Sequence, residues 1–384
     1  MVGVPLVKVS LDVTAVPSSP AGAGRYAVEL AAALARRDDP SLVLVARRDD
    51  ALRWQRLAGT RADVVASSPS PRPLRLAWEQ IALPALLRRM RPDVHHGPHY
   101  TMPERARMPV VVTIHDCTFF DHPEWHEPAK VRFFRRAIRV AASRASALVC
   151  VSETTARQLE AVCHVTAPVV IAPHGVDHLH FSPDPLDPDA DAAALRRLGI
   201  DPEARFVLFV GTVEPRKDVA TLVRAFSVLA DAERDVRLVL AGRRGWGTRP
   251  VDEALAATRH RDRITWTGYV PDDAVPALLR RASVVAYPSL AEGYGLPALE
   301  ALACGAPLVT TSGTAMAELA GEAATLVTPG DPEGLADALA TVLRGAGGSE
   351  ARRRREAGIA RAATLTWEAS AARHVEAYRI AAGA

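Results

Sequence analysis

The sequence predicts an α/β protein with two doubly wound, Rossmann-like parallel sheets, and three observations point to that class. The chain has 384 residues, 48% of them hydrophobic and 24% charged, which suits two or three globular domains. Short apolar runs alternate with helical patterns along it, as in βαβ units. The runs are continuous in hydrophobicity rather than alternating, which is typical of strands covered on both faces.

The first series of runs should form an N-terminal sheet. Its expected strands are Val4–Val9, Leu42–Ala46, Val110–Ile114, Ala147–Val151 and Val169–Ala172. Its clearest helical patterns are Gly24–Arg37 and Pro128–Arg144. The second pattern interleaves basic residues with Val131, Phe133, Phe134 and Ile138. It is either a solvated helix with its apolar stripe in the core or a peripheral membrane surface for a lipid-linked acceptor.

A segment rich in proline and acidic residues, Pro173–Asp191, follows the first series. Its four prolines cannot continue a helix or a central strand, so we expect an interdomain linker. The Asp187-Pro-Asp189-Ala-Asp191 spacing is similar to that of carboxylate metal ligands, but the prolines favour a solvated linker. The expected domains are residues 1–180 with a terminal helix at 366–384, and residues 181–365.

The second series of runs should form the other sheet. Its expected strands are Phe206–Val210, Arg237–Ala241, Ile264–Thr267, Val284–Tyr287, Leu308–Thr311 and Thr325–Val327. The helical patterns between them are Asp218–Ala230, Asp272–Arg281 and Pro297–Cys304. A last amphipathic helix has Trp367, Ala371, Val375 and Tyr378 on one face.

Charge and cysteine content argue against several classes of protein. The net charge of +3 is too small to indicate a nucleic-acid partner, and no run approaches the ~18–20 apolar residues of a membrane span. The four cysteines stand singly and no signal-peptide pattern is visible, which favours a reducing cytoplasm. Residues 1–180 carry 23 Lys and Arg against 17 Asp and Glu, and residues 181–384 carry 24 against 27. This is either scatter or a basic half that faces anionic lipid or an anionic acceptor.

The most informative pattern follows the fourth expected strand of the second series. Gly293 and Gly295 precede the helix expected at Pro297, and glycines there let backbone N–H groups converge on a phosphate. Glu292 and Glu300 bracket this loop. Carboxylates would repel a phosphate, so they should accept hydrogen bonds from sugar hydroxyls. The alternative is an ordinary loop with a helix-cap glutamate.

Arg216 and Lys217 follow the strand Phe206–Val210, at the carboxyl edge where doubly wound sheets bind ligands. Lys217 is one of only three lysines in the chain. An adjacent Arg and Lys suit a diphosphate, because Arg binds it bidentately and Lys acts as a point charge. The alternative, two solvated cations, is weakened because cations beside a helix N-terminus are unfavourable unless an anion visits.

His115 and Asp116 end another expected strand at its carboxyl edge. His115 is a candidate for substrate contact and Asp116 for orienting it or an acceptor hydroxyl, with a structural role for His115 as the alternative. The other histidines of this half show no metal-site spacing: His95, His96, His99, His122 and His126. Gly22 and Gly24 open a helix without the last Gly of a dinucleotide-binding motif, which disfavours a nicotinamide dehydrogenase.

Taken together, these segments resemble the retaining glycosyltransferases of family 4, which have the GT-B fold, and within them the mannosyltransferase-like enzymes of polysaccharide and O-antigen assembly. The motifs that carry the resemblance are the Gly22/Gly24 loop, Thr113-Ile-His-Asp, His122-Pro-Glu-Trp, Val151-Ser-Glu, Gly175-Val-Asp, Gly211-Thr-Val-Glu-Pro-Arg-Lys, Thr267-Gly-Tyr-Val, Tyr287-Pro-Ser, the Glu292–Glu300 segment and the Trp367 helix. Each is weak alone, and their joint order is specific.

The resemblance implies roles for these residues. Arg216 and Lys217 would bind the donor diphosphate, and Glu292 would hold sugar hydroxyls. Glu300 would bind the nucleotide ribose, and His115 would touch the sugar. The remaining candidates are Gly24, Gly295 and Leu296 through their N–H groups, Gly268, Tyr269 and Val270 around the base, Gly211, Thr212, Gly293 and Tyr294 elsewhere on the donor side, and Tyr100 and Asp116 on the acceptor side. The terminal helix would cross back onto the first domain.

The implied activity is retaining hexosyl transfer from a nucleotide sugar, with GDP-mannose the first donor to consider and UDP- or dTDP-sugars open. The acceptor would be a saccharide, a lipid-linked saccharide or a natural product. No cofactor is implied, and without a D-x-D at a strand end no obligatory metal either. The alternatives are a non-hydrolysing sugar-nucleotide epimerase and a non-catalytic partner of another transferase. The chain departs from the family pattern at His174 and Asp218, where Asn is usual, at Thr212, where some relatives have Arg, and at Tyr294, where Phe is common.

Overall fold

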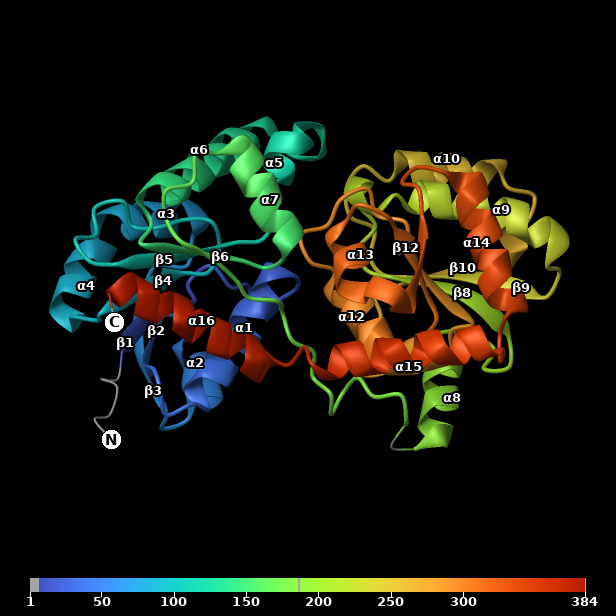
Figure 1. Ribbon diagram of the computed structural model, residues 1–384, viewed down its shortest axis with the longest axis horizontal. Helices are drawn as coiled ribbons and strands as arrows, with labels where there is room; N and C mark the ends of the chain where they lie inside the picture. The colour runs from blue at the N-terminus through green and yellow to red at the C-terminus, as the bar shows by residue number, and fades with distance from the viewer. Residues whose placement is uncertain (1–6, 186, 384) are drawn as a thin grey trace. The chain divides into compact units, whose positions relative to one another are not determined.

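The computed structural model describes residues 7–185 and 187–383 (Figure 1). The described chain forms two compact units, each with its own parallel sheet. The first unit contains the residues up to Gly175 and those from Trp367 onward, and the second is Val176–Thr366.

The first unit is a doubly wound sheet of seven described strands in the order β3-β2-β1-β4-β5-β6-β7, and every pair of neighbours is parallel. The strands are β1 (Lys8–Asp12), β2 (Ser41–Arg47), β3 (Ala62–Ser68), β4 (Val94–Gly97), β5 (Val110–Ile114), β6 (Ala147–Cys150) and β7 (Val169–Ile171). The α-helices are α1 (Ala23–Ala35), α2 (Ala51–Ala58), α3 (Arg72–Ile81), α4 (Leu83–Met90), α5 (Thr118–Asp121), α6 (Pro128–Arg144), α7 (Glu153–Val162) and α16 (Trp367–Ala382).

The second unit has six described strands, all parallel, in the order β10-β9-β8-β11-β12-β13. The strands are β8 (Arg205–Val210), β9 (Val236–Ala241), β10 (Ile264–Gly268), β11 (Val284–Tyr287), β12 (Leu308–Thr311) and β13 (Ala324–Val327). The α-helices are α8 (Pro188–Arg197), α9 (Val219–Ala232), α10 (Arg249–Ala257), α11 (Val275–Arg281), α12 (Leu296–Ala303), α13 (Ala315–Ala320), α14 (Pro332–Arg344) and α15 (Ser349–Ala363).

The apolar runs form buried strands, which confirms the predicted fold class of two doubly wound parallel sheets. Every residue of β5 and of β12 is buried, as strands covered on both faces require. Two strands were missed by the sequence reading, β3 and β4. The described part of the first strand starts at Lys8 and runs on to Asp12, and Val4–Leu6 of the expected strand lie outside the described residues.

The expected linker was wrong over its last residues, because α8 begins inside it. Pro188 stands in the first turn of α8, where its missing N–H costs no helical hydrogen bond. Asp187 caps the helix by accepting a hydrogen bond from the Asp189 N–H at 2.9 Å. Asp191 is buried rather than solvated, and Arg280 binds its carboxylate bidentately at 2.6 and 2.7 Å.

Two predicted helices have the burial expected of them. In α6 the side chains of Val131, Phe134 and Ile138 are buried while Phe133 is exposed, so the apolar stripe faces the core. The α16 residues Trp367, Ala371, Val375 and Tyr378 are all buried. Helix α16 packs against α1 and against strands β4 to β7 of the first unit, so the terminal helix returns to the first domain as expected (Figure 1).

Candidate active site

The candidate site in the second unit lies where the strand order changes direction. Strand β8 is paired with β9 on one side and with β11 on the other, so the chains leaving β8 and β11 diverge at their carboxyl ends. Ligands bind at such switch points in open α/β sheets. The loop after β8 carries Arg216 and Lys217, and the loop after β11 carries Glu292.

Backbone hydrogen bonds fix these two loops to each other and to the sheet. The Leu290 N–H donates to the Arg216 carbonyl at 2.7 Å, which joins the loops directly. The Thr311 hydroxyl, at the end of β12, donates to the Ser289 carbonyl at 2.5 Å. Gly211, directly after β8, has φ +143°, and a Cβ there would stand 3.1 Å from Lys217 Nζ. A glycine at this position therefore leaves room for the lysine ammonium.

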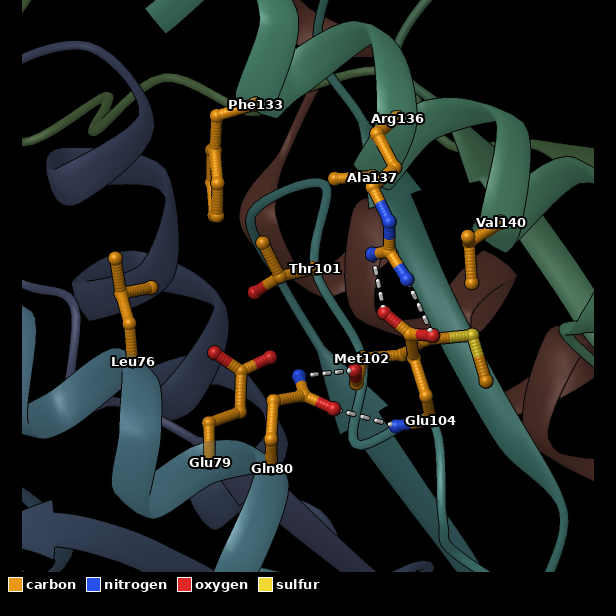
Figure 2. A pocket seen from close by; sticks show the side chains of 10 residues that line it. All are labelled: Leu76, Glu79, Gln80, Thr101, Met102, Glu104, Phe133, Arg136, Ala137 and Val140. Carbon is orange, nitrogen blue, oxygen red and sulfur yellow. Dashed lines mark hydrogen bonds and ion pairs between the residues drawn. The ribbon is translucent and has the colours of Figure 1, made fainter. Parts of the chain in front are cut away.

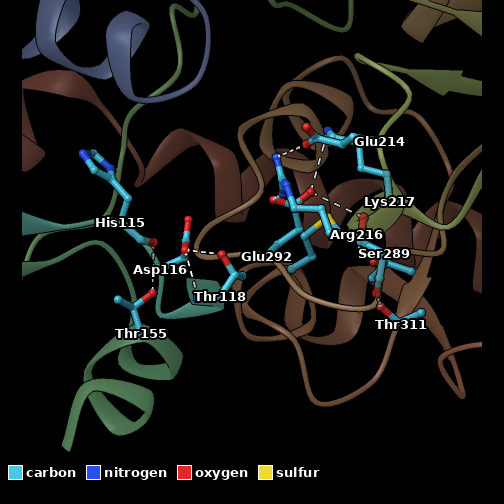
Figure 3. Close-up of polar contacts among 12 residues, drawn as sticks. His115, Asp116, Thr118, Thr155, Glu214, Arg216, Lys217, Ser289, Glu292 and Thr311 are labelled. Carbon is cyan, nitrogen blue, oxygen red and sulfur yellow. Dashed lines mark hydrogen bonds and ion pairs between the residues drawn. The ribbon is translucent and has the colours of Figure 1, made fainter. Parts of the chain in front are cut away.

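Two cations and two carboxylates form one cluster in these loops. Arg216 Nη2 lies 2.6 Å from Glu214 Oε1, and its Nη1 forms an ion pair with Glu292. Lys217 Nζ lies 3.7 Å from the other oxygen of Glu292. Figure 3 shows the Arg216 guanidinium held between the two carboxylates. The cluster holds its cations in fixed positions with no net charge, so an incoming anion would compete for Arg216 and Lys217.

Glu214 is the member of this cluster that the sequence reading missed as a site residue. It is buried, and it precedes Pro215 in the loop that leaves β8. The signal was present, because an acid beside Arg216 and Lys217 at a strand end is a ready ion-pair partner. Glu292 holds both cations in this structure, an arrangement that its implied role toward sugar hydroxyls did not include.

Asp218, one of the departures from the family pattern, has a local explanation. Its φ of +44° lies in the left-handed region, and its side chain caps α9 by accepting from the Thr221 N–H at 3.4 Å. Asp and Asn are the residues that both tolerate that backbone conformation and cap helices. An Asp in place of Asn therefore preserves the local geometry.

The glycine-rich loop leads into α12 as the sequence predicts. Gly295 is the N-cap residue with φ +100°, and a Cβ there would overlap Met316 Cγ at 2.3 Å. Gly293 and Tyr294 are buried, and Leu296 begins the helix half-buried. Glu300 is buried on the same helix.

The remaining donor-side candidates lie at the ends of β8 and β10. Thr212 is exposed, Gly268 ends β10 with φ +74°, and Val270 is buried. Tyr269 is 56% exposed, and the Arg243 guanidinium lies 4.4 Å from its ring centroid. Arg243 follows β9 and was not singled out from the sequence.

In the first unit, His115 is a buried neutral imidazole. Its Nε2 lies 2.8 Å from the Pro98 carbonyl, which can only accept, so Nε2 carries the proton. Burial lowers the pKa of His115. The Tyr26 ring meets it edge-on, with the ring centroids 4.9 Å apart.

Asp116 is held by hydrogen bonds from its neighbours. Its Oδ2 accepts from the Tyr100 hydroxyl at 3.0 Å. Its Oδ1 accepts from the Thr118 N–H and hydroxyl at 3.0 and 2.7 Å (Figure 3). Tyr100 is buried and adopts φ +62°. The two acceptor-side candidates are thus bonded to each other, and His115 lies beside them with its ring centroid 5.5 Å from that of Tyr100.

Gly24 lies in the first turn of α1, and its N–H donates to the Ala21 carbonyl at 3.0 Å. A phosphate bound through this N–H would have to replace that carbonyl. His174, the other departure from the family pattern, is buried and stacks on Trp367 with centroids 5.7 Å apart. This ring contact therefore helps to fix the position of the first residue of α16.

A buried hydrogen-bonded chain, formed by His374, Tyr26, Thr113, His96 and Tyr378, connects α16 to α1, β4 and β5. The four successive distances are 2.7, 2.8, 2.8 and 2.8 Å. His374 Nδ1 must donate to the Ser370 carbonyl, 2.7 Å away, so its Nε2 accepts from Tyr26. The remaining directions follow: Thr113 donates to Tyr26, His96 donates to Thr113, and Tyr378 donates to His96. Both imidazoles are neutral in this chain.

Within residues 7–185 and 187–383, no group of three or more His, Cys, Asp or Glu side chains could hold a metal ion. No helix in the same residues is long and apolar enough to cross a membrane.

Comparisons with known proteins agree with this architecture. Residues 20–178 match the family description "Glycosyltransferase Family 4", and residues 204–345 match "Glycosyl transferases group 1". The chain is 28% identical to the O-antigen chain mannosyltransferase B of Escherichia coli over 312 residues, which is 80% of this chain and 78% of that protein. It is 36% identical to the D-inositol 3-phosphate glycosyltransferase of Kineococcus radiotolerans over 236 residues, which is 56% of this chain and 52% of that protein.

Solved structures show the same fold at low sequence identity. The sucrose-phosphate synthase of Thermosynechococcus elongatus has a TM-score of 0.77 at 21% identity, covering 97% of this chain and 98% of that one. The HepE protein of Anabaena, solved with UDP, has a TM-score of 0.74 at 19% identity, covering 97% and 99%. With two doubly wound parallel sheets and family matches over most of its length, the chain belongs to the family 4 glycosyltransferases of the GT-B fold.

Proposed function

We propose that the protein is a retaining glycosyltransferase that moves a mannosyl-like hexosyl group from a nucleotide sugar to a hydroxyl of a saccharide, lipid-linked or natural-product acceptor. The observation that carries the proposal is the cluster of Arg216, Lys217, Glu214 and Glu292 at the switch point of the second sheet. Its paired cations are positioned before any ligand arrives, which lowers the cost of binding a diphosphate. Similarity to O-antigen chain mannosyltransferase B supports GDP-mannose as the first donor to test, ahead of UDP- and dTDP-sugars.

In the proposed reaction, the bond between the sugar C1 and the diphosphate oxygen breaks while the acceptor oxygen bonds to C1 on the same face. The acceptor proton passes to an oxygen of the leaving phosphate. Arg216 and Lys217 stabilise the negative charge that develops on the leaving group. When the donor binds, before these steps, Glu292 exchanges its cation contacts for hydrogen bonds to sugar hydroxyls.

The other donor-side roles are part of the same proposal. Glu300 binds the ribose, the backbone at Gly268–Val270 frames the base, and the N–H groups of Gly295 and Leu296 add to phosphate binding. On the first unit, His115 touches the sugar, and Asp116 with Tyr100 positions the acceptor hydroxyl. No metal is required, since the cations of the cluster supply the positive charge.

Binding and product analysis test the proposal together. GDP, UDP and dTDP are screened by thermal shift, and the matching sugar nucleotides are then incubated with acceptors and analysed by mass spectrometry and by the anomeric configuration of the product. We expect one nucleotide to raise the unfolding temperature and its sugar to appear on an acceptor with retained configuration. If none of the three nucleotides stabilises the protein, the donor site is wrong. Isomerisation of the sugar nucleotide without an acceptor would reveal an epimerase instead.

We also propose that the protein acts in the cytoplasm, with basic residues of α6 and the exposed Phe133 as a peripheral contact to anionic lipid. The four free cysteines support a reducing compartment. Flotation with anionic vesicles at low salt tests the membrane contact. If the protein does not float with the vesicles, the proposed membrane contact is wrong, and the transferase proposal is unaffected.

A further inference from the structure

The first unit contains a cavity of about 400 Å³ at the carboxyl edge of its sheet. Thr14 follows β1, Arg47 ends β2, and His99 follows β4, so three strand ends contribute to its wall. Strand β1 lies between β2 and β4, which makes this edge the switch point of the first sheet. The volume falls within the ~300–1,000 Å³ of small-molecule sites.

The charged side chains that line this cavity are all of one sign. They are Arg47, Arg72 and Arg75, and no Asp or Glu is among the lining residues. Arg47 has partners, because it lies 3.2 Å from an Asp49 oxygen and donates to the Val16 carbonyl at 2.6 Å. By contrast, within the described chain no ion pair or hydrogen bond engages the guanidinium of Arg72 or Arg75.

Both unpaired arginines project from the start of α3. They are three residues apart, so they share one face of the helix. The first turn of α3 contains no acidic residue and its N-cap makes no side-chain hydrogen bond. Two cations beside a helix N-terminus are unfavourable in the absence of an anion. The position therefore has a built-in excess of positive potential.

The positive charge of these arginines contributes to the lowered pKa of a residue that lines the cavity. The pKa of His99, which lines it, is lowered to about 3, chiefly by burial, with His115, Arg75 and Arg72 adding to the effect. Arg75 also acts on the carboxyl of Glu79, one turn further along α3. Burial raises the pKa of Glu79 to about 7, so near neutral pH it is partly protonated and neutralises Arg75 only in part.

The adjoining pocket between α3 and α6 provides a contrast. It measures about 90 Å³ and shares Leu76, Thr101 and Phe133 with the larger cavity (Figure 2). Its arginine, Arg136, is bound bidentately by Glu104 at 2.5 and 2.9 Å. Of these two pockets, the larger one is lined by arginines, Arg72 and Arg75, whose guanidinium groups have no ion pair within the described chain.

We propose that the cavity binds the anionic group of a sugar-sized ligand, a phosphate or a carboxylate, with Arg72 and Arg75 as the cations that hold it. Guanidinium groups suit either anion because they can donate two parallel hydrogen bonds to its oxygens. Phe133, Phe134 and Leu76 also line the cavity and offer apolar surface suited to one face of a sugar ring, and the hydroxyls of Thr14 and Thr101 can meet ring hydroxyls. If the proposed transferase function holds, on which this reading rests, the ligand is the acceptor and the acceptor carries an anionic group.

Calorimetric titration of the full chain with glucose 6-phosphate, glucuronate and glucose tests the proposal. We expect one or both anionic probes to bind and glucose to bind at least about tenfold more weakly. Preference for glucose 6-phosphate identifies a phosphate site, and preference for glucuronate identifies a carboxylate site. Equal binding of glucose, or no binding of either anion at millimolar concentration, overturns the proposal.

Variants assign the site to α3. Arg72→Ala/Arg75→Ala should lower the affinity for the anionic probe by at least about tenfold. Arg75→Lys should lower this affinity less, because the positive charge remains. Arg89→Ala is the matched control, since Arg89 is exposed on the neighbouring α4 and does not line the cavity. An equal loss of affinity in Arg89→Ala would show that the effect comes from the overall charge of the protein, and it would overturn the proposed site. Thermal unfolding midpoints confirm that each variant is folded.

Nucleotide binding separates this proposal from the proposed function. Arg72→Ala/Arg75→Ala should leave GDP or UDP affinity unchanged, because the cluster around Arg216 is in the second unit. If the anionic probe binds but no nucleotide does, the transferase assignment fails and the anion site stands. If transfer to an anionic acceptor proceeds at an unchanged rate in the double variant, the anion site fails and the transferase stands.

Discussion

Lowering the pH from 7 to 5 should strongly destabilise the first unit, because this unit contains buried, neutral histidines. Burial lowers the pKa of His95 to about 4, of His99 to about 3 and of His374 to about 4. In the unfolded chain the same side chains would titrate near 6.5. The native state therefore binds fewer protons than the unfolded state below pH 6.5, and the free energy of unfolding falls as the pH falls.

The magnitude follows from these values. Between pH 7 and 5, each of the three histidines removes about 2 kcal/mol of stability, since one pKa unit corresponds to about 1.4 kcal/mol. Glu79 works in the opposite direction, because its native pKa is raised to about 7 and the folded protein takes up a proton that the unfolded one does not. That offsets about 2 kcal/mol. The net loss from these four groups is about 3–4 kcal/mol, a large part of the stability of a typical domain.

The lowered pKa values of His96, His115 and His174 act in the same direction and increase the loss. The hydrogen-bonded chain on α16 explains why protonation cannot be accommodated in place. A second proton on His374 or His96 would occupy a nitrogen that must accept from Tyr26 or Tyr378. The bond would be lost and a charge would be buried.

Urea unfolding at pH 7, 6 and 5, followed by circular dichroism, measures this effect, and native-state hydrogen exchange assigns it to the first unit. His95→Asn is the diagnostic variant, since one titrating group fewer should reduce the slope of stability against pH by about 1.4 kcal/mol per unit near pH 5. A free energy of unfolding that is flat or rising from pH 7 to 5 would refute the reasoning. An unchanged slope in His95→Asn would refute the assignment of that histidine.

Three further predictions concern the second unit. Lys217→Ala should lower transfer by roughly 10²–10³-fold by removing a positive charge beside the leaving diphosphate, with Lys8→Ala as the matched lysine control; near-wild-type turnover, measured by product formation, would remove Lys217 from the mechanism. Asp218→Asn should change the free energy of unfolding by no more than about 0.5 kcal/mol, whereas Asp218→Ala should cost about 1–3 kcal/mol through the lost cap and the left-handed backbone; equal stability of the two variants in urea unfolding would contradict this. Gly295→Ala should cost about 2 kcal/mol or more, because the new Cβ overlaps Met316 at 2.3 Å and φ is +100°; an unshifted unfolding midpoint would show that the loop relaxes freely.

The sequence predicted well those features that depend on local pattern. The apolar run Val110–Ile114 forms β5 with the predicted bounds, and Pro128–Arg144 forms α6 with the predicted bounds. The strand β3 was missed because it is only partly buried and carries polar residues. The strand β4 was missed because its two adjacent histidines give it a polar sequence, although the folded strand is buried and both histidines have hydrogen-bond partners.

Those partners are distant along the chain, which is why the sequence could not supply them. His95 is bonded to Ser10, 85 positions away, and His96 to Tyr378, 282 positions away. The pairing of Arg216 with Glu292 spans 76 positions. Residue types identified Arg216, Lys217 and Glu292 as candidates, but only the folded sheet places the carboxylate against the cations and adds Glu214.

The position of α16 along the chain has a consequence for synthesis. The roughly 190 residues of the second unit are translated between Gly175 and Trp367, which takes about 10–40 s at 5–20 residues per second. During that interval the nascent first unit lacks the side chains that satisfy His96 and Tyr26. Its strands emerge from the ribosome first, yet its interior is completed only when the helix beginning at Trp367 arrives.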